Sequence, residues 1–301
     1  MAGSSLDLRD AQAVVAALRA GAQANRGAAC RQGSIDAVAA PGRLIATGDL
    51  HDNPVHLERL IRLAGMVEGV SPAEHGTTPC HLTLHEIIHG DRLVNGMDFS
   101  YRVMTRVAAL KARYPAHVHV LLGNHELAQM QKTGIVKDGV KSVEAFSAGL
   151  EYVFGEEAPA VAGAVDEFVR SMPLALRLHT PRGDILCAHS LPPAASMGRF
   201  DTTILTRDLT DDDYAPRQGA AHLMVWGRGY DAEGLEDLVE RWGVYLFILG
   251  HEKAPEGVVF VPPNAVVLNS DHEKGVYLPI DLSAPPTPEG AVGLVKHLAR
   301  D

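Results

Sequence analysis

The sequence predicts an α/β fold, in which strands and helices alternate along the chain. Short apolar segments of strand type alternate with amphipathic segments of helix type through the middle of the chain, which is the pattern of a sheet covered by helices. Strand-like segments joined by turns follow near the C-terminus and indicate an added antiparallel portion. The chain has 301 residues, of which 46% are hydrophobic, so it is long enough to build one large domain with its own core.

The spacing of apolar residues justifies each element in chain order. A first helix is predicted over residues 6–20, with Gly21 placed to end it. The strands through the middle of the chain are predicted at Arg43–Thr47, Leu82–His89, His117–Leu122, Asp184–Ala188 and Val244–Leu249. The helices between them, with apolar residues three and four apart on one face, are predicted at Pro54–Met66, Met97–Arg113, Ala160–Met172 and Ala232–Trp242, the last stopped by Gly243. The C-terminal strands are predicted at Val258–Val261, Ala265–Leu268 and Val276–Leu282.

One main domain is predicted, because no change of composition marks a boundary inside the chain. Residues 1–40 are expected to form an N-terminal helical extension, residues 41–283 the main domain, and residues 284–301 a linker with a short final helix. Three prolines within Ser283–Gly290 support the linker. Residues 136–175 are expected to form a small helical insertion in the main domain.

Composition argues against several classes of partner. The formal net charge is −10, with 27 Lys and Arg against 37 Asp and Glu, whereas nucleic acids and anionic membranes attract a basic face. The longest apolar runs, Ala13–Leu18 and Val244–Leu249, are too short to span a bilayer. We therefore expect no nucleic-acid or membrane partner. Three cysteines without metal-type spacing, and an N-terminus without an export signal, favour a reducing, cytoplasmic location.

Polar residues that can bind metal follow five of the predicted strands. They lie in the segments Gly48-Asp49-Leu50-His51, Gly90-Asp91, Gly123-Asn124-His125-Glu126, His189-Ser190 and Gly250-His251. Because the carboxyl ends of parallel strands lie along one edge of an open sheet, these side chains can converge in space. Asn53 and Pro54 also predict a helix that starts beside this edge, where its N-terminal dipole favours anions.

The candidate metal ligands are three imidazoles, two carboxylates and one amide: His51, His189, His251, Asp49, Asp91 and Asn124. Mixed nitrogen and oxygen ligands without thiolate suit zinc, iron or manganese. Six ligands are too many for one catalytic zinc ion with an open position, but they suit two ions that share a bridging carboxylate. Each pattern taken alone is more typical of turns and caps. The joint placement at five strand ends favours a metal centre.

The five segments, in this order, resemble the calcineurin-like metallophosphoesterases, and more closely the phosphoprotein phosphatase group, which includes bacterial diadenosine tetraphosphatases. The resemblance spans about residues 43–282 and includes Trp226-Gly227-Arg228-Gly229 ahead of Gly250-His251. It implies a layered α/β sandwich with mixed central sheets and helices outside. It also implies two transition-metal ions, of Mn, Fe or Zn, and a phosphorylated protein or small molecule as the substrate.

The same resemblance implies a role for each site residue. The metal ligands would be Asp49, His51 and His251 for one ion, and Asn124 and His189 for the other, with Asp91 bridging both. His125 would act as the general acid toward the leaving oxygen. Arg228 would hold a phosphate oxygen.

The second segment departs from the family pattern. The family usually reads Gly-Asp-x-x-Asp-Arg-Gly, whereas this chain reads Gly90-Asp91-Arg92-Leu93-Val94-Asn95-Gly96. Val94 then replaces the Asp that supports the catalytic His, and Asn95 replaces the Arg that grips phosphate. Asn95 and Arg92 are candidates to contact the substrate instead, together with Asn124. The chain before this segment is also longer than usual, around Val67–Cys80.

Three functional hypotheses follow. The leading one is a metal-dependent phosphatase that hydrolyses phosphate monoesters with a hydroxide activated by two metal ions. Hydrolysis of a dinucleoside polyphosphate is an alternative, motivated by the bacterial relatives. A metal- or phosphate-binding sensor with weakened catalysis is the third, motivated by Val94 and Asn95.

Three further histidines, His81, His85 and His89, recur four residues apart and raise the alternative of a second metal site. Their apolar neighbours are more typical of a strand, so the strand is preferred and these histidines receive no role in the site. Cys187, close to His189, is interpreted as a small buried hydrophobic residue rather than a nucleophile.

Overall fold

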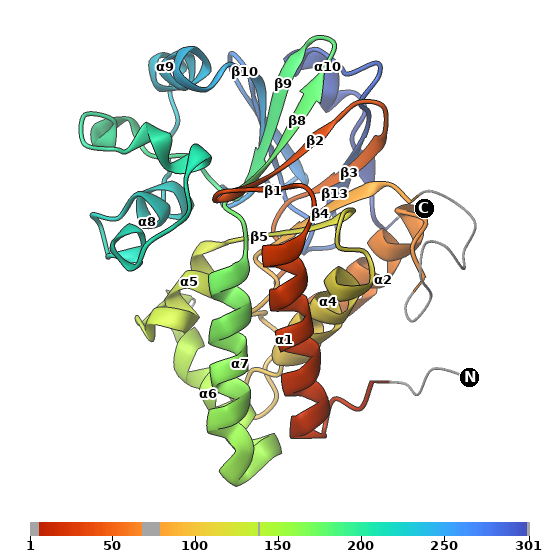
Figure 1. Cartoon of the computed structure of the whole chain (residues 1–301), viewed down its shortest axis with the longest axis vertical. Helices are drawn as coiled ribbons and strands as arrows, with labels where there is room; N and C mark the ends of the chain where they lie inside the picture. The colour runs from red at the N-terminus through yellow and green to blue at the C-terminus, as the bar shows by residue number, and fades with distance from the viewer. Residues whose placement is uncertain (1–5, 68–78, 138, 300–301) are drawn as a thin grey trace.

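Two large β-sheets stacked face to face form the centre of the protein, and helices lie outside them (Figure 1). The computed structural model describes residues 6–67, 79–137 and 139–299. Apolar side chains from strands of both sheets form one buried cluster between them, which includes Leu44, Leu121, Leu176, Ile248 and Leu278. The predicted layered α/β sandwich with mixed sheets is therefore confirmed.

The first sheet has five strands in the order β14-β13-β3-β4-β5. Strands β3, β4 and β5 run parallel, and β13 and β14 add antiparallel strands at one edge. The bounds are β3 Arg43–Thr47, β4 His81–His85, β5 Val118–Leu121, β13 Val276–Asp281 and β14 Lys296–His297. The parallel pairing places the carboxyl ends of β3, β4 and β5 at the same edge.

The second sheet has seven strands in the order β1-β2-β8-β9-β10-β12-β11. Strands β9, β10 and β12 run parallel, as do β2 and β8, and the other pairs are antiparallel. The bounds are β1 Arg31–Gln32, β2 Ile35–Ala39, β8 Ala175–Thr180, β9 Gly183–Ala188, β10 Val244–Leu249, β11 Val258–Val261 and β12 Ala265–Leu268.

Helices cover the sheets on two sides (Figure 1). One group lies on the lower side in that view, and α1 packs along α4 and α7 within it. The helix bounds are α1 Ala11–Gly27, α2 Pro54–Leu63, α4 Tyr101–Arg113, α5 Asn124–Gln131, α6 Ser142–Phe154, α7 Ala158–Ser171, α8 Ala220–Val225, α9 Ala232–Trp242 and α10 Pro288–Val292. A hairpin of β6 Val136–Lys137 and β7 Val140–Lys141 precedes α6.

Several elements have the predicted bounds, namely β3, β10, β11, β12 and α9. Gly243 follows α9 with a φ of 66°, a left-handed conformation that ends the helix as predicted. The helix predicted at residues 6–20 instead spans Ala11–Gly27, so Gly21 lies inside α1. A Cβ at Gly21 would lie 2.7 Å from the Cβ of Ala108, so this glycine permits close approach to α4 rather than ending α1.

The strand predicted at Leu82–His89 is wrong at its carboxyl end. β4 stops at His85 because Glu86 has a φ of 49°, which turns the chain out of the extended conformation. The backbone carbonyl of Glu86 then accepts a hydrogen bond of 2.7 Å from the amide of His51. The chain therefore leaves the sheet after His85, four residues earlier than the predicted end at His89.

The residues around the main domain join the same sheets and helices. β2, within the predicted extension of residues 1–40, pairs with β8 in the second sheet. α6 and α7 lie within residues 136–175, and α10 begins at Pro288, inside the predicted linker, with β14 after it. The predicted long segment Val67–Cys80 lies largely outside the described residues. Among residues 6–67, 79–137 and 139–299, no helix combines the length and hydropathy that a membrane span requires.

Candidate metal centre

The loops that follow β3, β4, β9 and β10, together with the first turn of α5, bring one group of polar side chains together. The members of this group are all buried and are Asp49, His51, His85, Glu86, Asn124, His125, His189 and His251. Their ligand atoms form overlapping sets that could hold metal ions, made of Asp49, His85 and His189; of His51, Glu86 and His125; and of Glu86, His189 and His251. The predicted convergence at strand ends is therefore found for five of the six predicted ligands.

Glu86 lies at the centre of this group and faces imidazoles with both carboxylate oxygens. Its Oε2 is 3.1 Å from Nε2 of His189, and its Oε1 is 3.5 Å from Nε2 of His51. Burial raises the pKa of Glu86 to about 8 despite the opposing charge of His189, and Asp49 adds to the rise. A cation between these groups would offset the cost of the buried charge. The geometry gives Glu86 the position of a carboxylate shared by two ligand sets.

His189 joins most of the other candidate ligands. Its Nε2 lies 2.8 Å from Oδ1 of Asn124 and 3.1 Å from Nδ1 of His251. Burial lowers the pKa of His189, but the carboxylates of Glu86 and Asp49 raise it overall. Metal binding releases such a proton, because a ligating imidazole is neutral.

His85 supports His189 from behind. Its Nε2 donates to the backbone carbonyl of Thr47 at 2.8 Å, so Nδ1 of the neutral ring accepts. Nδ1 of His189, 3.1 Å away, then donates to it, so Nε2 of His189 is the nitrogen that faces Glu86 and Asn124 and would release its proton to a metal ion. Oriented imidazoles of this kind are typical of metal ligands.

The donor set fits metal ions. Nε2 of His251 is buried and has no hydrogen-bond partner among the described residues, and burial lowers the pKa of this histidine, which favours the neutral form that ligates metal. Glycine is required beside the centre: a Cβ at Gly250 would lie 2.2 Å from Oδ1 of Asp49, and a Cβ at Gly123 would lie 2.9 Å from Oε2 of Glu86.

Backbone strain concentrates in the same loops. His51, Glu86, His89 and His251 all have positive φ, between 41° and 65°. Residues other than glycine adopt this conformation rarely, and structures retain it mainly at functional sites.

The structure does not bring Asp91 into this centre. Asp91 is exposed and belongs to no candidate ligand set among the described residues, whereas Glu86, five residues earlier, is buried within two of them. The turn at Glu86 ends β4 earlier than predicted, so the segment that reaches the site is His85-Glu86-Ile87-Ile88-His89. The predicted place of Asp91 among the ligands is thus corrected: Glu86, not Asp91, belongs to two candidate ligand sets.

Because residues 85–89 reach the site, Val94 and Asn95 do not lie where the resemblance placed them. Val94 is exposed over 55% of its surface, and Asn95 is also exposed, with a φ of 53° in the loop after Gly90. The residue beside His125 is instead His89, with the two Nδ1 atoms 3.0 Å apart. His85 and His89 were given no site role from the sequence, although their spacing was the signal that pointed to them.

The neighbours of His251 also differ from those predicted. His251 was expected beside Asp49 and His51, but its ring lies with His189 and Glu86. Asp49 contacts His251 through the backbone instead, because the amide of His251 donates to Oδ2 of Asp49 at 2.9 Å.

Two arginines lie at the edge of the centre. Arg228 donates to the backbone carbonyl of His251 at 2.6 Å and is half-exposed, so its guanidinium borders the site. Arg92 donates to the backbone carbonyl of His51 at 3.1 Å and lies 3.2 Å from Oδ1 of Asp271. It ties the loop after β3 to the loop after β4.

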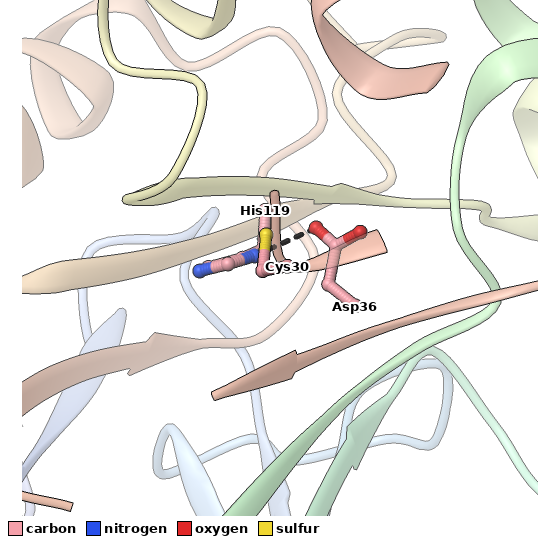
Figure 2. A group of neighbouring side chains, drawn as sticks. All are labelled: Cys30, Asp36 and His119. Atoms are coloured by element: carbon pink, nitrogen blue, oxygen red, sulfur yellow. Dashed lines mark hydrogen bonds and ion pairs between the residues drawn. The ribbon is translucent and has the colours of Figure 1, made fainter. Parts of the chain in front are cut away.

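A second group of potential ligands, Cys30, Asp36 and His119, shares no residue with the sets described above (Figure 2). Asp36 already accepts hydrogen bonds from His119 at 2.7 Å and from Arg31 at 2.9 Å, and the buried ammonium of Lys111 is 3.8 Å away. Burial and Asp36 raise the pKa of Cys30 to about 11, which disfavours the thiolate that binds metal. This group is therefore a compensated buried ion network.

Comparison with known proteins agrees with this geometry. Residues 42–255 match the sequence model of the calcineurin-like phosphoesterases. The serine/threonine-protein phosphatase 6 catalytic subunit of Drosophila melanogaster is 27% identical over 193 residues, which cover 62% of this chain and 50% of that relative. The chain thus spans about half the length of this relative.

Solved structures of phosphatases share the fold. A protein serine/threonine phosphatase from Saccharomyces cerevisiae with similarity to human phosphatase PP5 superposes with a TM-score of 0.63 at 18% identity, covering 90% of this chain and 83% of that one. A cold-active protein-tyrosine phosphatase of a psychrophilic Shewanella species superposes with a TM-score of 0.58 at 13% identity, covering 89% and 83%. Because the family match spans more than half of the sequence, the chain belongs to the calcineurin-like phosphoesterase family of hydrolases.

Proposed function

We propose that this protein is a phosphatase that uses two metal ions to hydrolyse phosphate monoesters, with phosphoproteins as the leading substrate class. The observation that carries the proposal is the carboxylate of Glu86, whose two oxygens face His51 on one side and His189 on the other. The proposed ligands are Asp49, His51 and Glu86 for one ion, and Glu86, Asn124, His189 and His251 for the other. Mixed nitrogen and oxygen ligands support Mn, Fe or Zn.

When bound, such a pair of ions supplies an activated water at neutral pH and neutralises charge on the phosphate oxygens. The chain's own residues bind the substrate and move the proton. We assign His125 as the general acid, because its Nε2 lies 3.7 Å from Oε1 of Glu86 and therefore faces the centre. It donates the proton on Nε2 to the departing oxygen of the ester. A proton donor of this kind typically contributes a factor of about 100 to 10,000.

Arg228 is the proposed phosphate-binding side chain. Its guanidinium is half-exposed at the rim and is oriented by the carbonyl of His251 and by Glu252, 3.6 Å away. Arginine suits this task because its planar fork matches phosphate oxygens. Asn95 and Arg92 lie in the exposed loop after Gly90, from which Arg92 is the better candidate for a further contact.

The phosphoprotein assignment draws on the similarity to serine/threonine phosphatases. Hydrolysis of a dinucleoside polyphosphate stays an alternative, since the proposed centre would serve either bond. The sensor hypothesis rests on Val94 and Asn95, and it is less favoured because His89 rather than Val94 lies beside His125. The free thiols of Cys30, Cys80 and Cys187 support a cytoplasmic location.

Elemental analysis and a substrate screen test the proposal together. Purified protein is expected to hold about two transition-metal ions per chain and to hydrolyse an aryl phosphate. Phosphopeptides and dinucleoside polyphosphates, offered at equal concentration, then separate the two substrate classes by product analysis. Metal-loaded protein that cleaves none of these compounds would refute the phosphatase assignment.

A further inference from the structure

His89 and Gln129 extend inward from His125 and have no role in the proposed function above. Nδ1 of His89 lies 3.0 Å from Nδ1 of His125, and the two rings meet edge to face with centroids 5.1 Å apart. Nε2 of His89 lies 2.9 Å from Oε1 of Gln129. All three side chains are buried. They form a continuous line of hydrogen bonds that ends at the metal centre.

Gln129 determines which atoms donate and which accept in this line of hydrogen bonds. Oε1 of Gln129 can only accept, so Nε2 of His89 carries a hydrogen and donates it. A neutral His89 then offers only a lone pair at Nδ1, and Nδ1 of His125 must donate to it. The other nitrogen of His125, Nε2, is thereby left for the exchangeable proton on the side that faces Glu86.

The surroundings hold His89 in this orientation. Its backbone amide donates to Oγ of Ser100 at 3.2 Å, and the ring of Phe146 packs edge to face at 5.8 Å. Its φ of 58° is one of the strained conformations of the site loops. Gln129 comes four residues after His125 on α5, so both side chains project from one face of that helix.

We propose that Gln129 and His89 are positioning residues that fix the tautomer and the ring orientation of His125. This inference rests on the proposed function, in which His125 is the proton donor. During the transfer, the N–H bond at Nε2 of His125 breaks, the proton goes to the leaving oxygen, and the bonding pair stays on Nε2. The hydrogen on Nδ1 remains donated to His89 throughout, so the ring does not rotate between turnovers.

The tautomers can be measured without turnover. In the full chain labelled with ¹⁵N-histidine, either metal-free or loaded with diamagnetic zinc, long-range ¹H–¹⁵N spectra at neutral pH should show the hydrogen of His89 on Nε2. The spectra of H89A and H125A assign the two rings. A hydrogen on Nδ1 of His89 would overturn the proposal, because the line of donors would then run in the opposite direction.

Substitution of Gln129 tests the functional consequence. Q129M keeps the length of the side chain but removes the acceptor, so we expect kcat to fall by about 10- to 100-fold, the usual effect of losing a supporting hydrogen bond around a site. The KM and the metal content should stay near wild type. Q129E restores an acceptor for Nε2 of His89 and should recover both the tautomer and most of the kcat. Wild-type kcat in Q129M would contradict the proposal.

A cavity beside this line allows a chemical rescue. Gln129 and Phe146, which both contact His89, also line a cavity of about 500 Å³ between α5, α6 and α7. H89G should lose kcat, and added imidazole should restore part of it, because the free ring can occupy the space of His89. S147A, which changes the same cavity wall without touching His89, is the matched control and should keep wild-type kcat.

These outcomes separate the inference from the proposed function. If wild-type protein hydrolyses no phosphate ester, the proposed function fails, while the histidine spectra still report the tautomers. If H89G is folded by circular dichroism but imidazole restores nothing, and Q129M has wild-type tautomers, the positioning role fails even though the enzyme is active.

Discussion

Oε2 of Glu86 lies 3.1 Å from Nε2 of His189, where the loop after β4 of one sheet meets the loop after β9 of the other. This contact joins the two sheets at the proposed metal centre. It also makes Glu86, rather than Asp91, the carboxylate on which metal binding should depend.

Replacing Glu86 should remove metal, whereas replacing Asp91 should not. E86Q keeps the shape of the side chain but loses the negative charge, so we expect it to retain less than half of the wild-type metal content. D91N changes an exposed carboxylate five residues away and should retain wild-type metal. Elemental analysis of both proteins, purified in parallel, decides between them. Metal loss in D91N together with full metal in E86Q would reverse the assignment.

His85 should act on metal affinity through His189. Because Nδ1 of His85 lies 3.1 Å from Nδ1 of His189, H85A leaves that imidazole without its supporting acceptor. Loss of a supporting partner of a metal ligand typically lowers affinity by about 10- to 100-fold. Competition with a chromophoric chelator measures the change. H179A, at an exposed position on β8, is the control and should leave affinity unchanged.

Replacement of His125 should separate catalysis from metal binding. H125N removes the proposed proton donor, so kcat for an alkyl phosphate should fall by about 100- to 10,000-fold while the metal content stays near wild type. The loss should be smaller for an aryl phosphate, whose leaving group needs less protonation. Equal losses with both substrates would argue that His125 does not donate the proton.

His81, at the start of β4, should make folding stability dependent on pH. Burial lowers the pKa of His81 to about 3, with His119 and His117 contributing. The unfolded chain, with a pKa of about 6.5, therefore binds the extra proton first, and stability falls as the pH drops from 6.5 toward 3. This residue should cost roughly 2 kcal/mol of unfolding free energy between pH 7 and pH 5.

H81F isolates that contribution. Urea unfolding of the chelator-treated protein at pH 7 and pH 5 gives the loss for wild type and for the variant. The difference in unfolding free energy between wild type and H81F at pH 7 reports the packing of the side chain. The change in that difference between pH 7 and pH 5 reports the binding of the proton. If the unfolding free energy of H81F depended on pH as strongly as that of wild type, His81 would not be the source of the pH dependence.

Gly21 should be intolerant of even one methyl group. Because a Cβ there would lie 2.7 Å from the Cβ of Ala108, G21A must push α1 from α4, which should cost about 1–3 kcal/mol. Gly163, exposed on α7 with nothing within 4 Å of a Cβ, is the control. G163A should be stabilised by about 0.5–1 kcal/mol, because alanine favours a helix. Thermal or urea unfolding compares the two variants, and equal effects would contradict the packing argument.

The pattern of neighbouring residues was sufficient to predict many of the strands and helices. β3 and β10 are short, buried apolar runs, and α9 combines an N-cap aspartate, Asp231, with a C-terminal glycine, Gly243. Such signals depend on neighbouring residues alone. Strands β1, β2 and β8 were not predicted from the sequence, because their extended conformation depends on pairing with distant segments.

The sequence by itself determined the family and the order of the strand ends, and it predicted Asp49, His51, Asn124, His125, His189 and His251 as site residues. Only the tertiary structure decided which residues of the second segment join them. Glu86, His85 and His89 reach the site because of the left-handed turn at Glu86, which is fixed by backbone pairing with residues 50–52, some 35 positions earlier in the chain. A turn fixed by such distant contacts leaves no periodicity in the local sequence.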